Sequence, residues 1–346
     1  MRAIFAFDAV SPAIQRTRDF LFRQFSWGTY LKLCLVAIVT EGLGSSFQSS
    51  SHNASSSDHG PITHSPFHQH PEWIAAAVAA LLLALVVSLF VFYLVTRLRF
   101  AYFHCLTYKV REIRPGWHLY RDKAWRFFWM NVAVGACFFL LIVLNAIPYI
   151  GGIMRLVQEM PQGGPPDWGL ILSLVLPLIP NILLLVLVGV AADVVLRDWM
   201  LPHYALDDAS AGQAWARVWA AIKAEKIQFV AYAILRLILP MVAMVALFMV
   251  LLLPGLALAG SLAAVEYGLH STFADAAGAS AIVGTLLEVF FGVLAFCFMV
   301  LIGICLGGPV STAVREYALV FYGGRYPALG DILEPAAYAG PAPIEA

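Results

Sequence analysis

The sequence predicts an all-α integral membrane bundle of six transmembrane helices, with amphipathic helices at the membrane interface. Hydrophobic residues make up 61% and charged residues 12% of the 346 residues, and the mean hydropathy is +0.81. A soluble domain is about half apolar and about a quarter charged, so this chain could not cover its surface in water. Counted along alternating apolar segments, every Lys and Arg except Arg155 and Arg236 falls on one side, and cationic loops stay on the cytoplasmic side.

A spanning helix needs about 20 mostly apolar residues to cross about 30 Å of hydrocarbon. The candidate segments are Tyr30–Phe47, Trp73–Val95, Phe127–Ile150, Trp168–Leu196, Phe229–Leu253 and Ala281–Leu306. The first is the weakest, because Lys32 lies near its start and Glu41 near its end. If it only dipped into the bilayer, five spans would leave the N-terminal cations on the wrong side of the membrane. Six spans are therefore expected, with the N- and C-termini cytoplasmic.

These spans predict three regions along the chain. Residues 1–26 form a cytoplasmic amphipathic segment, residues 27–334 the transmembrane domain, and residues 335–346 a disordered Pro/Ala-rich tail. Within the transmembrane domain, the cytoplasmic connections 96–126 and 197–227 are basic.

Three cytoplasmic segments place apolar residues at helical spacing beside cations. One begins at Ser11-Pro12, one continues from the Trp73–Val95 span to Pro115-Gly116, and one begins at the capping box Ser210-x-x-Gln213. This pattern suits the surface of a membrane that contains anionic lipid. It suits equally well helices that pack on the cytoplasmic ends of the bundle, and the sequence leaves both interpretations open.

The predicted external loop 45–72 is rich in Ser, His and Asn and contains no Lys or Arg. Its histidines are His52, His59, His64, His68 and His70. Neutral imidazoles bind Zn, Ni or Cu, so metal capture is one interpretation. A defined metal site also needs rigid geometry and partners that orient the ligands. The low-complexity composition favours a solvated loop instead, so no metal or cofactor is predicted.

Four ionisable residues fall inside the predicted spans: Glu41, Asp193, Arg236 and Glu288. A charge in hydrocarbon is costly and usually faces a partner or a water-filled cavity. By residue count, Asp193 and Arg236 share the cytoplasmic half of the membrane, which predicts that they form an ion pair. Glu41 and Glu288 fall in the external half, where Arg155 in an external loop is the cation that could reach them. Structural polar contacts are favoured over a proton or substrate pathway.

Prolines and glycines mark further positions in the spans. Pro177, Pro180, Pro240 and Pro309 interrupt three of them, and Gly303 and Gly307 have a spacing that allows close helix packing. Broken helices form binding sites in many secondary transporters. The sequence shows no inverted repeat that would support transport.

The sequence carries no P-loop, no dinucleotide-binding glycine pattern, and neither an HExxH nor a GxSxG motif. No Ser–His or Cys–His pair can be assembled at a common depth, so the chain is not expected to be an enzyme. The formal net charge is zero, which argues against a nucleic-acid partner.

The segment that starts at Asp198-Trp199-Met200-Leu201-Pro202 and runs through Ala205–Trp215 to Trp219 carries a loose motif. It resembles a broad group of prokaryotic six-span proteins that are similar to the membrane domain of some glycerophosphodiester phosphodiesterases. In that group a span exits at a proline, acidic and small residues follow, and an amphipathic helix with a tryptophan returns to the membrane. Arg315–Tyr322 is also similar. The resemblance implies this architecture and a bacterial inner membrane. It implies no activity, because no phosphodiesterase domain or catalytic Glu/His set is present.

The expected function is that of a non-enzymatic scaffold or accessory component acting on membrane partners or lipids. Anionic lipids at the cytoplasmic helices and a membrane protein are the expected partners. The alternative is a transporter of a small solute or lipid that uses Glu41, Asp193, Arg236, Glu288 and the proline breaks.

Overall fold

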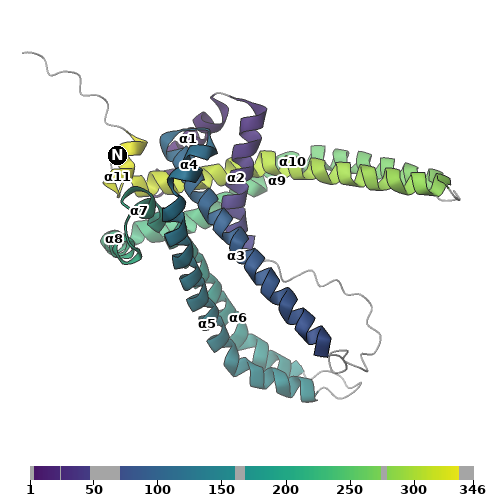
Figure 1. Cartoon of the computed structure of the whole chain (residues 1–346), viewed down its shortest axis with the longest axis horizontal. Helices are drawn as coiled ribbons and strands as arrows, with labels where there is room; N and C mark the ends of the chain where they lie inside the picture. Colours follow the sequence, from purple (N-terminus) through teal and green to yellow (C-terminus); the bar gives the residue numbers. More distant parts are fainter. Residues whose placement is uncertain (1–3, 24, 47–70, 160–167, 274–278, 335–346) are drawn as a thin grey trace, which may run out of the picture. The chain divides into compact units, whose positions relative to one another are not determined.

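A computed structural model describes residues 4–23, 25–46, 71–159, 168–273 and 279–334 (Figure 1). The described residues form helices and turns and contain no strand, which confirms the all-α class. The five loop histidines, His52, His59, His64, His68 and His70, lie outside the described residues, as does the tail 335–346.

The helices follow one another along the chain in twelve described elements. They are α1 (Val10–Phe22), α2 (Trp27–Ser46), α3 (Pro71–Tyr108), α4 (Ile113–Leu119), α5 (Arg121–Glu159), α6 (Trp168–Val194), the π-helical turn η2 (Val195–Met200), α7 (Leu201–Leu206), α8 (Ala211–Ala224), α9 (Lys226–Phe273), α10 (Ala279–Gly323) and α11 (Pro327–Leu333).

Among the described residues, five helices are long and apolar enough to cross a membrane: α3, α5, α6 together with η2 and α7, α9 and α10. Their large apolar side chains are exposed, as at Leu82, Leu183 and Leu253. Such surfaces are untenable in water and suit contact with lipid. Five of the six predicted spans are therefore confirmed as helices of spanning length and hydropathy. The sixth segment, with Lys32 and Glu41, is a helix (α2) but is not among the five.

The described residues fall into two compact units. The first comprises Met1–Ser57, Tyr102–Ile113 and Ile227–Ala346, and the second comprises Asp58–Ala101 and Arg114–Lys226.

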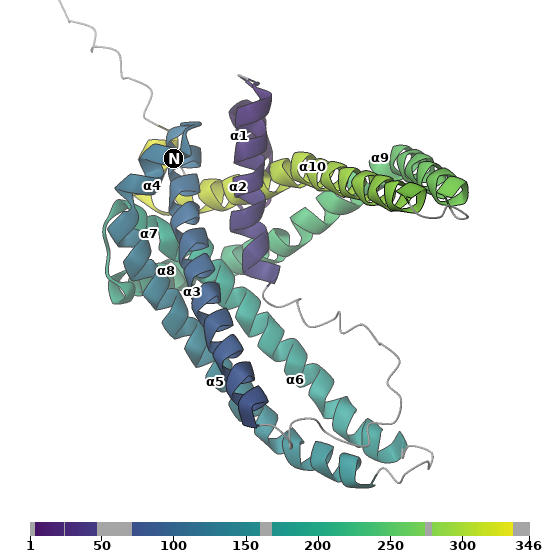
Figure 2. The ribbon, with the colours of Figure 1, turned by 45° about the vertical axis from the view of Figure 1, so that its right-hand side comes forward.

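In the first unit, α10 packs against α1, α2 and α11 (Figures 1 and 2). The C-terminal part of α10 contributes an aromatic stack: the ring centroids of Tyr317 and Phe321 lie 5.0 and 4.4 Å from that of Tyr232 in α9. The Arg325 guanidinium lies 4.0 Å from the Phe321 ring centroid, and its Nη1 donates to the Ile4 carbonyl at 3.2 Å. Stacking therefore joins α9 to α10. Arg325, held on the Phe321 ring, ties the N-terminal segment to the end of α10 through its hydrogen bond to Ile4.

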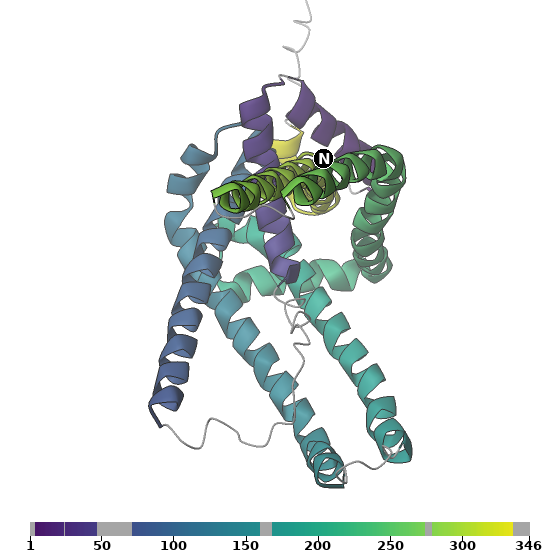
Figure 3. The same cartoon turned by 90° about the vertical axis from the view of Figure 1, so that its right-hand side faces the viewer.

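The α2 helix crosses α10 with a close backbone approach (Figures 1 and 3). A β-carbon placed on Gly308 would lie 2.7 Å from Cα of Cys34 and closer still to its side chain. Gly307 of the predicted pair also lies at this crossing, since a β-carbon there would lie 3.3 Å from Cδ1 of Ile38 in α2. Gly303 faces open space, and the tightest contact is at Gly308, which was not predicted.

At the same crossing, α2 supplies the hydrogen-bond donor that a proline removes from α10. Pro309 has no N–H to donate to the carbonyl of Cys305, four residues earlier. The hydroxyl of Tyr30 in α2 donates to this carbonyl at 2.7 Å. The Thr312 hydroxyl donates to the Gly308 carbonyl at 2.8 Å. In hydrocarbon such backbone groups must be satisfied within the protein, so α10 stays helical through its proline.

The other predicted proline breaks are also absent. Pro177 and Pro180 lie inside α6, and Pro240 lies inside α9, all within continuous helices. The prediction of broken helices was wrong. A proline removes one backbone N–H donor, and its ring clashes with the carbonyl four residues earlier. A long apolar helix tolerates both effects when the residues on either side of the proline stay helical.

In the second unit, α5 packs against α6, and α8 packs against η2. Amides bridge the apolar pair α5 and α6: Nδ2 of Asn145 donates to Oδ1 of Asn181 at 3.0 Å, and Nδ2 of Asn181 donates to the Tyr149 hydroxyl at 3.2 Å. A polar contact of this kind fixes which faces of two apolar helices meet.

The three predicted amphipathic segments have different outcomes. The first is a helix, but α1 begins at Val10 with Ala9 as its N-cap, so Ser11-Pro12 lies within its first turn. The third begins with the predicted capping box: the Ser210 hydroxyl accepts from the Gln213 N–H, and the Gln213 side chain accepts from the Ser210 N–H.

The second segment is not a surface helix. Residues 99–103 and 105–107 at the end of α3 are buried, so this stretch packs within the protein. The helix also ends before Pro115-Gly116, which lies inside α4. It ends because Lys109 adopts a left-handed φ of 56°, the usual conformation just after a helix C-terminus.

Replacing Gly308 by Ala should destabilise the α2–α10 crossing. The new methyl group would meet the Cys34 backbone and force the helices apart, an overpacking that costs about 1–3 kcal/mol. Unfolding of the purified protein in mixed micelles of rising dodecyl sulfate content measures this loss. Gly303→Ala, in the same helix and in open space, is the control and should be neutral or slightly stabilising. Equal stability of the two variants would contradict the crossing.

Candidate functional site

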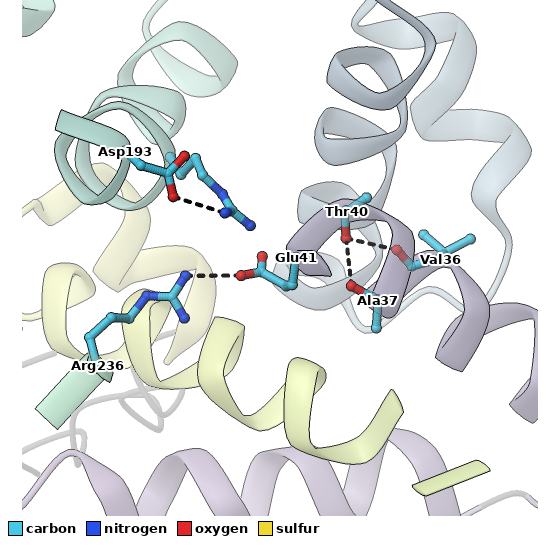
Figure 4. Close-up of polar contacts among 7 residues, drawn as sticks. Val36, Ala37, Thr40, Glu41, Asp193 and Arg236 are labelled. Atoms are coloured by element: carbon cyan, nitrogen blue, oxygen red, sulfur yellow. Dashed lines mark hydrogen bonds and ion pairs between the residues drawn. The ribbon is translucent and has the colours of Figure 1, made fainter. Parts of the chain in front are cut away.

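The candidate site residue Arg236 in α9 pairs with Glu41 in α2, both in the first unit. Arg236 Nη2 lies 2.9 Å from Glu41 Oε2 (Figure 4), and the two side chains are 10% and 13% exposed. In the preceding turn of α2, the Thr40 hydroxyl donates to the carbonyls of Val36 and Ala37 at 2.8 and 3.1 Å. This end of α2 therefore carries one charge, and that charge is matched by a cation from α9.

Asp193 has an ion-pair partner within its own unit. In the second unit, Asp193 accepts from Arg197 Nη1 at 2.9 Å, one helical turn further on, and the Arg197 side chain is 5% exposed. Arg236 belongs to the first unit, so its predicted pairing with Asp193, which rested on a depth read from residue number, stays a prediction. The α9 helix has 48 residues and extends about 70 Å, more than twice the hydrocarbon thickness, so a position along it does not fix a depth.

Glu288 in α10 also has a partner that the sequence analysis missed. Its Oε1 lies 3.2 Å from Nδ1 of His270 in α9, and both side chains are more exposed than the Glu41–Arg236 pair. Glu41 and Glu288 therefore use Arg236 and His270, where the sequence pointed to Arg155. The side chain of Arg155 lies outside what the structure describes.

A second buried ion pair in the first unit was not predicted. Glu316 in α10 is 1% exposed, and its Oε2 accepts from Arg16 Nε of α1 at 2.9 Å. Arg16 Nη1 also donates to the Leu333 carbonyl at the end of α11, at 3.2 Å. One guanidinium thus holds three helices together. The signal in the sequence was Glu316 itself, a carboxylate inside the apolar α10, directly before the aromatic run Tyr317–Tyr322.

In the second unit, cations of the basic connections are bound by neighbouring groups. Arg126 pairs with Asp208 and Arg217 pairs with Asp207. Lys123 Nζ donates to the Ala205 carbonyl at 2.8 Å. Arg126 therefore joins the loop between α7 and α8 to α5, Lys123 joins α5 to α7, and Arg217 joins the loop to α8. About half of each arginine side chain stays exposed.

The α8 helix presents two faces. Ala214 and Val218 are buried, whereas Trp215 and Trp219 are nearly half exposed and stack with ring centroids 5.9 Å apart. Lys223 Nζ lies 5.4 Å from the Trp219 ring centroid. An exposed indole pair beside an ammonium group is typical of a helix at the headgroup level of a membrane.

Within the described ranges, no group of three or more His, Cys, Asp or Glu residues could hold a metal ion. The chemistry of the described site residues is therefore that of ion pairs and hydrogen bonds, with indoles and cations at one surface.

Five long helices with exposed apolar surfaces are compatible with a multi-pass membrane protein. A family of unknown function (DUF7544) matches residues 4–332, and the chain belongs to this family. No curated protein and no solved structure matches the sequence. The similarity to the membrane domain of glycerophosphodiester phosphodiesterases is untested by these comparisons and stays a prediction.

Removing one partner of the Glu41–Arg236 pair should cost more stability than removing both charges. Glu41→Gln or Arg236→Gln alone leaves a mostly buried charge without its counterion, a loss of about 3 kcal/mol. The double variant should recover at least about 1 kcal/mol of the sum, measured by unfolding in mixed micelles. Glu288→Gln, at a more exposed pair, is the control and should change stability by about 0.5 kcal/mol or less. Additive losses would contradict a direct pair.

Proposed function

We propose that the chain is a six-span protein of a bacterial inner membrane, with both termini in the cytoplasm. It acts as a non-enzymatic scaffold or accessory component that organises membrane partners or lipids. The observation that carries this proposal is α8, whose exposed face holds the stacked Trp215 and Trp219 beside Lys223. Such a face docks on anionic headgroups or on a membrane protein at that level.

The contacts of the intramembrane charges support a scaffold over a transporter. Glu41 and Arg236 are paired, Asp193 is paired with Arg197, and Glu288 lies beside His270. A carboxylate that moves a proton or binds a substrate has to exchange its partner during each cycle. Here each carboxylate is matched by a cation or an imidazole in the resting structure. The continuous helices through the prolines also remove the half-helix ends that transporters use for binding.

The sixth span in this proposal is α2. Its 20 residues extend about 30 Å, which matches the hydrocarbon thickness. Lys32 near its start can extend toward the headgroups, and Glu41 near its end is neutralised by Arg236. The packing of α2 on α10, itself apolar enough to span, supports a position within the membrane.

A topology experiment tests the six spans. An N-terminal epitope tag should be protected from antibody in intact spheroplasts and become accessible after permeabilisation, and green fluorescent protein fused at the C-terminus should fluoresce. Alkaline phosphatase inserted in loop 48–72 should be active, because that loop is external. If α2 does not cross, the N-terminal tag is accessible in intact spheroplasts, and the six-span proposal fails.

Copurification tests the scaffold role. After gentle solubilisation of membranes, a membrane protein or an anionic phospholipid should copurify with the chain in stoichiometric amount. Mass spectrometry identifies it. The Trp215→Ala/Trp219→Ala/Lys223→Gln variant should lose most of it, because the exposed face of α8 is removed. Trp27→Ala, at an exposed indole of α2, is the control and should keep it. Failure to copurify anything, or equal loss in both variants, would exclude this role for α8.

A further inference from the structure

The first unit contains a small cavity at the place where α1, the end of α3 and α10 come together. Its volume is about 250 Å³, and four cationic side chains line it: Arg16, Arg23, Lys109 and Arg111. Two carboxylates, Asp19 and Glu316, also line it, so the cavity carries two net positive charges. A concentration of cations around a volume of this size suits a small anion.

The charges are not cancelled within the cavity. The carboxylate of Glu316 is already bound by Arg16 at 2.9 Å, and Asp19 is exposed. Within the described part of the chain, the side chains of Arg23 and Lys109 have no hydrogen bond or ion pair. Nη2 of Arg16 is buried and has no hydrogen-bond partner among these residues. A buried guanidinium nitrogen without an acceptor costs free energy, which an anion in the cavity would restore.

Two features fix the backbone that carries the cations before any ligand arrives. Arg111 Nη2 donates to the Phe20 carbonyl of α1 at 2.6 Å, which joins the segment after α3 to the helix that carries Arg16 and Arg23. The left-handed turn at Lys109 ends α3 beside the same helix. Because these contacts already hold the backbone, a ligand would not have to order the cavity.

We propose that this cavity binds a phosphate group, as a phosphomonoester or phosphodiester. Guanidinium groups match the planar, bidentate hydrogen bonding of phosphate oxygens, and Lys109 adds a point charge. The phosphate can belong to a phospholipid headgroup or to a soluble ester. The inference rests on the proposed function only for the cytoplasmic position of α1, where anionic lipid is at hand.

The test uses the full chain purified in neutral detergent. One arm titrates inorganic phosphate, followed by calorimetry. The other adds phosphatidic acid or phosphatidylglycerol in micelles, with phosphatidylcholine as the reference, and counts retained lipid by native mass spectrometry. The site variant is Arg23→Gln/Lys109→Gln, which removes two exposed cations of the cavity and leaves the Arg16–Glu316 pair in place. The matched control is Arg18→Gln/Lys32→Gln, which removes two exposed cations of α1 and α2 outside the cavity.

Binding that weakens tenfold or more in the site variant and stays within twofold in the control is the expected result. If inorganic phosphate binds, the ligand is a soluble phosphate; if only the anionic lipids bind, it is a headgroup. Equal weakening in both variants would show general surface electrostatics and overturn the proposal, as would a lack of binding in both arms. Neither outcome bears on copurification through α8, so the scaffold role and the phosphate site can fail independently.

Discussion

The contact between α2 and α10 is the constraint on which the first unit depends. Gly308 lets the two backbones approach, Pro309 leaves the Cys305 carbonyl without its helical donor, and Tyr30 supplies that donor from α2. In water the carbonyl could bind a solvent molecule, but in hydrocarbon it has to be satisfied by the protein. The close approach and the hydrogen bond therefore require each other. With α2 fixed in this way, Glu41 at its far end meets Arg236.

Buried charged side chains connect helices to one another through ion pairs and hydrogen bonds. Arg16 connects α1, α10 and α11 through Glu316 and the Leu333 carbonyl, and Arg325 connects the N-terminal segment to the aromatic stack of α10. Lipid tails are as apolar as the helix surfaces, so hydrophobic burial contributes little to their association. Ion pairs and hydrogen bonds with defined geometry therefore select one helix packing among many.

The sequence predicted what depends on composition and local pattern. The all-α class, five spanning helices and the capping box of α8 needed only hydropathy, length and a four-residue motif. The partners of Asp193 and Glu41 could not be predicted, because the depth of a residue depends on helix tilt and length, which hydropathy does not report. The close approach at Gly308 in place of Gly303 depends on the rotation of α2 against α10, which is a property of packing alone.

The hydrogen bond from Tyr30 to Cys305 spans 275 residues of sequence, and this separation has a consequence for biosynthesis. At about 5–20 residues per second, α10 leaves the ribosome roughly 15–55 s after α2. During that interval α2 lacks the Cys305 carbonyl that accepts from its Tyr30 hydroxyl and the Arg236 guanidinium that pairs with its Glu41. The contacts that fix α2 in place can therefore form only after α9 and α10 have been made, late in the synthesis of the chain.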